Sequence, residues 1–280
     1  DSYELCLTNE LRIQNGGGIR PREYYGALRG INPAPYAAFL AAPGRDGGAL
    51  SVCCSSPERF LKLHRDGTLE AKPIKGTARR QPDRLGDALA RGRLHSPKEH
   101  AENLMIVDLL RNDLARVSSL GSVRVPKLMD VETYANVHQL VSTVTGARAR
   151  GASPVACVRA AFPGGSMTGA PKIRSMRILD DIEGGPRGVY SGSIGFFSVN
   201  GTFDLNIVIR TAVFERGGGG ADGDTITIGA GGAITHLADP QAELEEVMLK
   251  AEPLLLAARA TAGGARVHGD EELVGAPLVR

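Results

Sequence analysis

Short apolar runs bounded by tight-turn dipeptides constrain this fold more than any other feature of the sequence. The runs cover residues 1–15, 36–42, 49–55, 59–64, 190–199, 203–214 and 225–229. Asp66-Gly67 and Asn200-Gly201 follow two of them, and such dipeptides favour the tight turns of β-hairpins. Because a hairpin joins neighbouring antiparallel strands, the sequence predicts antiparallel sheets.

Helical patterns stand in separate blocks between these runs. We expect helices at residues 21–27, from about Ser96 onward, and at 154–162, 170–183 and 241–262. Ser96 can cap its helix, and Pro97 suits the first turn. Residues 71–84 are predicted to be a basic loop, 217–220 a mobile loop and 263–280 a poorly ordered tail. Blocks of strands and helices indicate an α+β fold, with one domain from residue 1 to 262.

Composition excludes several classes of function. The 280 residues carry a net charge of only +2, and no segment concentrates Lys and Arg with aromatic residues, so nucleic acid is not an expected partner. No apolar run approaches the ~20 residues that span a bilayer. The four cysteines form no CxxC pair, which argues against zinc and fits buried thiols in a reducing cytoplasm. Since the chain opens directly in apolar alternation, we expect it to be a piece of a longer polypeptide.

Two pairs of carboxylates are spaced to share a helix face. Glu99 and Glu102 lie three residues apart in one predicted helix, and Glu243 and Glu246 repeat that spacing in the last helix. Four carboxylates from two helices can converge on a hard cation such as Mg²⁺. Solvated surface glutamates are the competing interpretation, because Glu246 and Lys250 also have the spacing of an ordinary i,i+4 pair.

Two glycine segments and one arginine are further candidates for binding anions. Residues 164–172 precede a helix, so their backbone N–H groups can hold an anion or simply form a turn. Residues 229–232 follow a strand and can bring amides close to a carboxylate. Arg210 lies in an apolar run and needs a partner, either a structural acid or a bound carboxylate.

Eight segments occur together, and in this order, in the chorismate-utilising enzymes. The segments are Ser56–Phe60, Pro73–Thr77, Ala101–Asp113, Gly165–Lys172, Arg187–Gly192, Asn206–Arg210, Gly229–Gly231 and Glu243–Glu246 with Lys250. The chain resembles this family from Asp1 to about Ala258. The resemblance implies an α+β fold of antiparallel β-sheets flanked by helices, with the active site between two sub-layers. It also implies that the N-terminal part of the family fold is absent here.

Three positions distinguish the members of this family. Aminodeoxychorismate synthases resemble this chain in carrying Lys at position 75, where anthranilate synthases have Ala. Isochorismate and salicylate synthases have a water-activating Lys where this chain has Glu4, which argues against water as the nucleophile. Anthranilate synthases have a His directly before Leu-Val-Ser; Gln139 takes that place and His138 lies one residue earlier, so the role of that His is not transferred.

The resemblance assigns a role to each candidate residue. Lys75 would attack ring carbon 2 of chorismate as a neutral amine, and Glu58 would protonate the departing 4-hydroxyl. Ammonia from a glutamine amidotransferase subunit or fused domain would then displace the lysine, giving 4-amino-4-deoxychorismate. Mg²⁺ would be held by Glu99, Glu102, Glu243 and Glu246. The substrate would be bound by Tyr190, Arg210, Gly229, Gly231, Lys250, Gly76 and Thr77.

Three other functions remain as alternatives. Anthranilate synthase component I uses the same substrate, and Lys75 argues against it. A non-catalytic chorismate-binding fragment is the alternative of another class, which the intact carboxylates and Lys75 disfavour. A phosphate-binding transferase would use the glycine loop at 164–169, but no Gly-Lys-Ser/Thr follows it.

Overall fold

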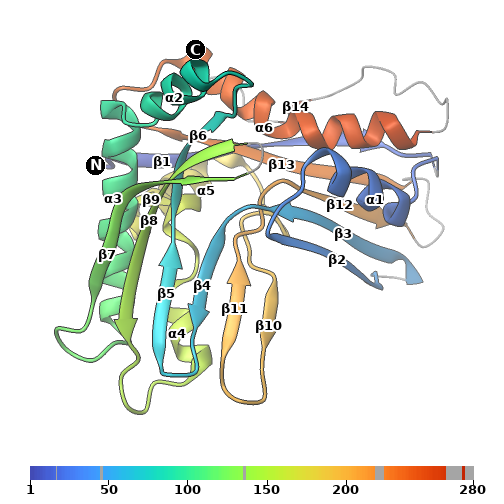
Figure 1. The fold of residues 1–280 in the computed structure, drawn as a ribbon. Helices are drawn as coiled ribbons and strands as arrows, with labels where there is room; N and C mark the ends of the chain where they lie inside the picture. Colours follow the sequence, from blue (N-terminus) through green and yellow to red (C-terminus); the bar gives the residue numbers. More distant parts are fainter. Residues whose placement is uncertain (17, 45–46, 135–136, 218–223, 263–272, 275–280) are drawn as a thin grey trace.

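Two antiparallel sheets meet near the middle of the molecule and run away from that junction in different directions (Figure 1). The computed structural model describes residues 1–16, 18–44, 47–134, 137–217, 224–262 and 273–274. None of the described helices is long and apolar enough to cross a membrane. The predicted α+β class, with antiparallel sheets flanked by helices, is confirmed.

The first sheet has the strand order β14-β1-β13-β12-β3-β2, with β9 also paired to β1. Its strands are β1 (Glu4–Gln14), β2 (Tyr36–Pro43), β3 (Ala49–Ser56), β9 (Gly169–Ala170), β12 (Thr211–Arg216), β13 (Thr225–Ile234) and β14 (Leu273–Val274). Helices α1 (Pro21–Ile31) and α6 (Pro240–Thr261) cover one face of it (Figure 1). Tyr24 of α1 is fully buried there and donates a hydrogen bond to the Leu254 carbonyl of α6.

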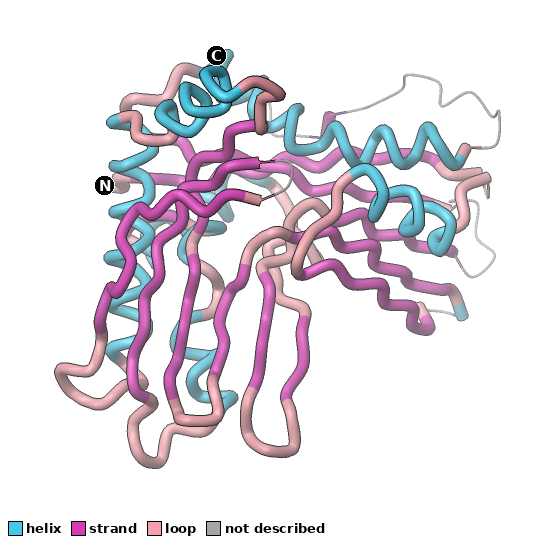
Figure 2. The backbone as a smooth tube through the Cα atoms, viewed as in Figure 1, coloured by secondary structure: helices cyan, strands magenta, loops and turns pink. Residues whose placement is uncertain are grey.

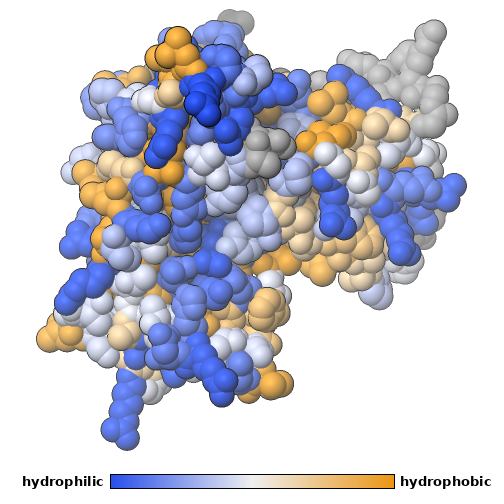
Figure 3. All heavy atoms as spheres, in the orientation of Figure 1, coloured by the Kyte–Doolittle hydropathy of each residue, from blue (hydrophilic) through white to orange (hydrophobic). Residues whose placement is uncertain are grey.

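The second sheet has the order β10-β11-β4-β5-β8-β6, with β7 also paired to β8. Its strands are β4 (Arg59–Leu63), β5 (Thr68–Lys72), β6 (Ile74–Arg79), β7 (Arg124–Thr133), β8 (Val137–Ala147), β10 (Gly195–Phe197) and β11 (Phe203–Asn206). Helices α3 (Pro97–Ala115) and α4 (Pro154–Ala161) pack on one face over an aliphatic core. Hydrophilic side chains cover much of the opposite face, where Lys72 pairs with Glu132 and Arg59 with Asp204 (Figure 3).

Local turn and cap signals gave accurate boundaries. Asp66-Gly67 joins β4 to β5, and Asn200-Gly201 joins β10 to β11. Ser96 caps α3 by accepting a hydrogen bond from the Glu99 backbone N–H, as expected. All four cysteines are free and buried, also as expected.

The basic loop predicted at residues 71–84 is wrong. That segment contains the end of β5 and the whole of β6, and α2 (Arg84–Arg93) begins at its last residue. Strand β6 has no apolar alternation because most of its side chains are only partly buried. Its partner β8 is far away in sequence, so no hairpin turn marks the pairing. The mobile loop at 217–220 and the tail at 263–280 lie mostly outside the described residues.

The apolar run 203–214 is not one strand, as predicted, but two strands in different sheets. Residues 207–210 leave β11 and cross to β12, passing from one sheet to the other as a loop (Figure 2). Arg210 stands at this crossing with a positive φ of 49° rather than inside a strand. The run at 190–199 likewise contributes only the short strand β10.

Candidate active site

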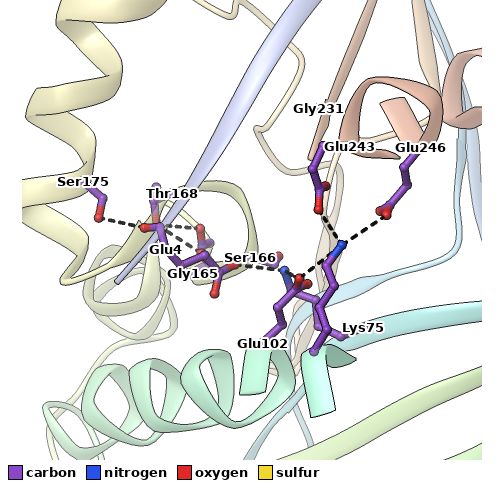
Figure 4. A network of polar contacts seen from close by, with 12 residues as sticks. Glu4, Lys75, Glu102, Gly165, Ser166, Thr168, Ser175, Gly231, Glu243 and Glu246 are labelled. Atoms are coloured by element: carbon purple, nitrogen blue, oxygen red, sulfur yellow. Dashed lines mark hydrogen bonds and ion pairs between the residues drawn. The ribbon is translucent and has the colours of Figure 1, made fainter. Parts of the chain in front are cut away.

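The candidate residues gather where the two sheets meet. Glu4 of β1, Lys75 of β6 and Glu102 of α3 lie together, and Glu243 and Glu246 of α6 approach from the other side (Figure 4). These elements come from both sheets, so the junction brings together residues from the whole length of the chain.

A β-bulge places Lys75. The pairing of β6 with β8 shifts between Lys75 and Thr77, and Gly76 between them has a φ of +78°. A Cβ at Gly76 would lie 2.8 Å from Glu99 Oε2, so a larger residue would strain the backbone and push the Glu99 carboxylate aside. Thr77, on the other side of the bulge, is exposed.

Two carboxylates hold the Lys75 ammonium. Its Nζ lies 2.9 Å from Glu4 Oε1 and 3.4 Å from Glu102 Oε2. Burial alone would lower the pKa of Lys75, but the charges of Glu4 and Glu102 outweigh it and raise that pKa above the ordinary value. The neutral amine expected from the sequence is therefore not the form that these side chains favour, and a proton must leave Nζ before it can attack.

Glu58 is a buried carboxyl group of a different character. It lies between β3 and β4 and is only 6% exposed, and burial raises its pKa to about 7. The Lys75 charge and a hydrogen bond of 3.2 Å from the Ser166 hydroxyl oppose that rise without cancelling it. A carboxyl group with a pKa near 7 is suited to donate a proton at neutral pH.

The glycine loop supports Glu58 from one side. Gly164, Gly165 and Ser166 line a small cavity together with Glu58 and Ile207. The loop forms a short 3₁₀ turn, and the Thr168 hydroxyl donates back to the carbonyls of Gly164 and Gly165.

Lys172, which ends the same motif, has a structural contact. Its ammonium lies 2.6 Å from Asp113 and donates to the Ala161 carbonyl, which ties α5 (Lys172–Glu183) to α3. A lysine paired in this way does not serve the phosphate-binding alternative.

Three of the four predicted metal ligands surround one ammonium group. Lys98 Nζ hydrogen-bonds to Glu243 Oε1 and lies 3.8 Å from Glu102 Oε1 and 3.9 Å from Glu246 Oε2. Glu99 is the fourth predicted ligand. Burial raises its pKa, and the negative charge of Glu246 raises it further, so Glu99 interacts with the same group of carboxylates. The carboxylates therefore converge on a cation, and that cation is a lysine.

These carboxylates do not form a ready metal cluster. Among the described residues, no three His, Cys, Asp or Glu side chains already have the mutual placement of metal ligands. Glu102 nevertheless has a buried Oε1 without a hydrogen-bond donor, and oxygen ligands on a concentrated negative charge suit Mg²⁺. These carboxylate oxygens are suitable ligands for the ion, although three of the four carboxylates now contact Lys98.

Arg210 has an unfilled need for an anion. Its guanidinium is partly buried, which lowers its pKa, and its one hydrogen bond to a described residue is a 3.4 Å contact with Asn32 Oδ1. No described acid lies within ion-pair distance of it. Glu58 is the acid whose charge reaches Arg210, and the two partners that the sequence left open, a structural acid and a bound carboxylate, both stay predictions.

The other predicted substrate contacts gather around β13. Tyr190 is buried with its ring over Gly229, where any Cβ would collide with the ring. Gly231 lies against the Leu7 carbonyl, 2.6 Å from where its Cβ would be. Lys250 donates to the Gly231 carbonyl and lies 2.8 Å from Glu246.

His138 belongs to the structural framework. Its ring lies 3.0 Å from Asp87 and 2.8 Å from the Thr133 hydroxyl, on a strand where Gln139 points the opposite way. These contacts give His138 a structural role.

Several polar residues of the site gave little or no signal in the sequence. Lys98 and Ser166 were not singled out as site residues, and Glu4 was noted only for the lysine it replaces. Arg187 was also missed; it clamps Glu183 and donates to the carbonyls of Met167 and Cys6. Only the i,i+4 spacing of Lys98 to Glu102 was visible in advance.

A paired amine, a buried carboxyl group with a raised pKa and a nearby group of carboxylates are typical components of an enzyme active site. Comparison with known sequences specifies the family. The model of the chorismate binding enzyme family matches residues 1–256, and the chain therefore belongs to that family.

Individual relatives agree with this assignment. The chain is 56% identical over 253 residues to a probable aminodeoxychorismate synthase of Oryza sativa subsp. japonica, covering 90% of this chain and 27% of the relative. It is 51% identical over 276 residues to an aminodeoxychorismate synthase of Streptomyces pristinaespiralis, covering 98% of this chain and 36% of the relative. The chain thus spans about a third or less of these relatives.

A solved structure shares the fold. Anthranilate synthase component I from Streptococcus pneumoniae superposes with a TM-score of 0.75 at 32% identity, over 90% of this chain and 53% of that one. Both the fold and the family expected from the sequence motifs are thereby confirmed.

Proposed function

We propose that this chain is the chorismate-binding catalytic part of an aminodeoxychorismate synthase. It would convert chorismate and ammonia to 4-amino-4-deoxychorismate, a precursor of p-aminobenzoate for folate or for a related secondary metabolite. The observation that carries the proposal is Lys75, a buried amine at the junction of the sheets with the proton-donating Glu58 nearby.

Lys75 and Glu58 divide the first half of the reaction. The lysine nitrogen forms a bond to ring carbon 2, both ring double bonds shift, and the bond from carbon 4 to its hydroxyl breaks. Glu58 gives the departing oxygen a proton, so that it leaves as water. The proton that Lys75 must lose first is within hydrogen-bond reach of Glu4 Oε1.

Ammonia completes the exchange. It forms a bond to carbon 4, both ring double bonds shift back, and the bond between carbon 2 and the Lys75 nitrogen breaks. The lysine is released as a free amine, and the net result is replacement of the hydroxyl group by an amino group.

The remaining residues bind and orient the substrate. Arg210 and the Lys250 ammonium near Gly231 supply positive charge for the two carboxylates of chorismate. Glu99, Glu102, Glu243 and Glu246 would hold Mg²⁺, which polarises the ring carboxylate when bound.

The ammonia source is a proposed glutamine amidotransferase, as a separate subunit or a fused domain. The chain alone should use free ammonia, and glutamine only with that partner. Four buried free thiols fit a reducing compartment, for which the cytoplasm is proposed; the relative from rice is named as chloroplastic.

The product decides between this function and anthranilate synthesis, which the shared fold leaves possible. The purified chain is supplied with chorismate, Mg²⁺ and an ammonium salt, and the product is identified by chromatography and mass spectrometry. Aminodeoxychorismate supports the proposal. Anthranilate or its 2-amino precursor would move the function to the alternative, and no conversion would point to a non-catalytic fragment.

A further inference from the structure

Lys98 stands where the proposed metal ion would be bound. Its ammonium approaches Glu102, Glu243 and Glu246. Figure 4 shows these three glutamates, which come from both helices of the predicted metal site. Lys98 lies one turn of α3 before Glu102, so the same helix supplies both the carboxylate and the cation that competes for it.

The two cations cannot use these oxygens together. Mg²⁺ binds oxygens at about 2.0–2.1 Å and needs their lone pairs facing it. Glu243 Oε1 already accepts a hydrogen bond from Lys98, and Glu102 Oε1, which has no hydrogen-bond donor among the described residues, lies 3.8 Å from the same ammonium. Metal binding must therefore displace the lysine.

The lysine has room to leave. Its side chain is 33% exposed, whereas those of Glu102 and Glu243 are 8% and 4% exposed. A long flexible ammonium at the edge of the site can move into water at little cost, while the buried carboxylates stay in place.

We propose that Lys98 is an internal counter-ion that holds the metal-binding carboxylates together in the metal-free protein and is displaced when Mg²⁺ binds. This inference rests on the metal assignment in the proposed function. It gives Lys98 two opposing effects: it stabilises the empty site, and it weakens the affinity of that site for metal.

The test measures metal binding directly. Lys98→Met removes the charge and keeps the length of the side chain, Lys98→Gln is a second neutral variant, and Lys98→Arg keeps the charge. Lys127→Met is the matched control, because Lys127 is an exposed lysine with one acidic neighbour, Asp130. Mn²⁺ binding to each purified protein is followed by electron paramagnetic resonance, and Mg²⁺ is titrated against the bound Mn²⁺.

Both neutral variants should bind Mn²⁺ more tightly than the wild type, by roughly three- to tenfold. Lys98→Arg and Lys127→Met should not gain affinity. Without metal, the two neutral variants should unfold at a lower temperature than the wild type, and saturating Mg²⁺ should restore their midpoint.

Equal or weaker Mn²⁺ binding by both neutral variants would overturn the inference, as would the absence of Mn²⁺ binding in every protein. Binding is measured without chorismate or ammonia. A result against Lys98 therefore leaves the product assay unaffected, and an unexpected product leaves the binding result unaffected.

Discussion

The Glu4 carboxylate lies 2.9 Å from the Lys75 ammonium, although the two residues are 71 positions apart in the sequence. Family members that activate water have a lysine where this chain has Glu4. Two lysines at these places would repel each other, whereas Glu4 and Lys75 attract. In the proposed function, the acid at position 4 is thus the ion-pair partner of the amine nucleophile at position 75.

Replacing Lys75 should change the product and not only the rate. With chorismate but no ammonia, the wild type should carry an adduct on the peptide that contains Lys75, and Lys75→Ala should not. Ammonia can still add directly at carbon 2 in that variant, so residual turnover should give the 2-amino product. Lys75→Arg should be inactive because a guanidinium stays protonated. Mass spectrometry of the peptide and the product tests both points, with Lys72→Ala as the control.

Removing the acid should alter the pH dependence. Glu58 must be protonated to act, and its pKa is about 7. Activity should therefore fall as the pH rises above about 7, and Glu58→Gln should lower kcat by about 10²–10⁴-fold and lose that falling limb. No rising limb from Lys75 should appear near neutral pH, because Glu4 and Glu102 raise the pKa of the lysine and its proton has to pass to a group within the site, such as Glu4. A falling limb that persists in Glu58→Gln would assign the acid to another group.

The same carboxyl group should affect stability. Its folded pKa of about 7 lies above its ordinary value of 4.5, so the folded state holds this proton more strongly. The resulting stabilisation is complete below pH 4.5 and is lost as the pH rises to about 7. The free energy of unfolding of the wild type, relative to Glu58→Gln, should therefore fall between pH 5 and pH 8. Urea unfolding at both values measures it, and a constant difference would contradict the raised pKa.

Metal binding should depend on carboxylates from both α3 and α6, and in α6 on those of one helix face. Excess chelator should abolish turnover, and Mn²⁺ should restore it in part. Glu102→Gln and Glu246→Gln should each weaken metal binding by at least about tenfold without unfolding the protein. Glu245→Gln is the matched control, because Glu245 points about 100° away from Glu246. Undiminished turnover in chelator would contradict the metal assignment.

Gly76 should be irreplaceable because of its positive φ and its contact with Glu99. Gly67, which has only the positive φ, separates the two effects. Gly76→Ala combines a positive φ with a clash against Glu99, whereas Gly67→Ala has a positive φ of 88° in open space. Each should cost about 1–2 kcal/mol of stability in urea unfolding. Only Gly76→Ala should also lose activity, since it displaces Lys75. Equal activity in the two variants would show that the bulge does not position the lysine.

The sequence predicted those parts of the fold whose signals are local. Turn dipeptides and the Ser96 cap depend on a few neighbouring residues, and they gave hairpins and helix starts correctly. Strand β8 was missed because it is buried on both faces and has polar residues such as Ser142 among the apolar ones, so it shows no alternation. The crossing at 207–210 was missed because its residues are as apolar as the strands on either side.

The site residues divide in the same way, into those with a local signal in the sequence and those defined by contacts between distant segments. Glu99, Glu102, Glu243 and Glu246 were found from spacing on single helices, and the family motifs supplied Lys75 and Glu58. The contact of Lys98 with Glu243 joins two helices whose contacting residues are 145 positions apart in the sequence. No spacing within one element reports such a contact, so it became visible only when the sheets were assembled.

The pairing of β1 with β13 has a consequence for how the protein is made. Residues 4–14 are synthesised long before their partners at 225–234. Sheets built from such distant pairs form slowly, because a long loop must close before the pairing stabilises it. The pairing of β1 with β13 can therefore form only after residues 225–234 have been made, and until β1 is in place Lys75 lacks its neighbour Glu4.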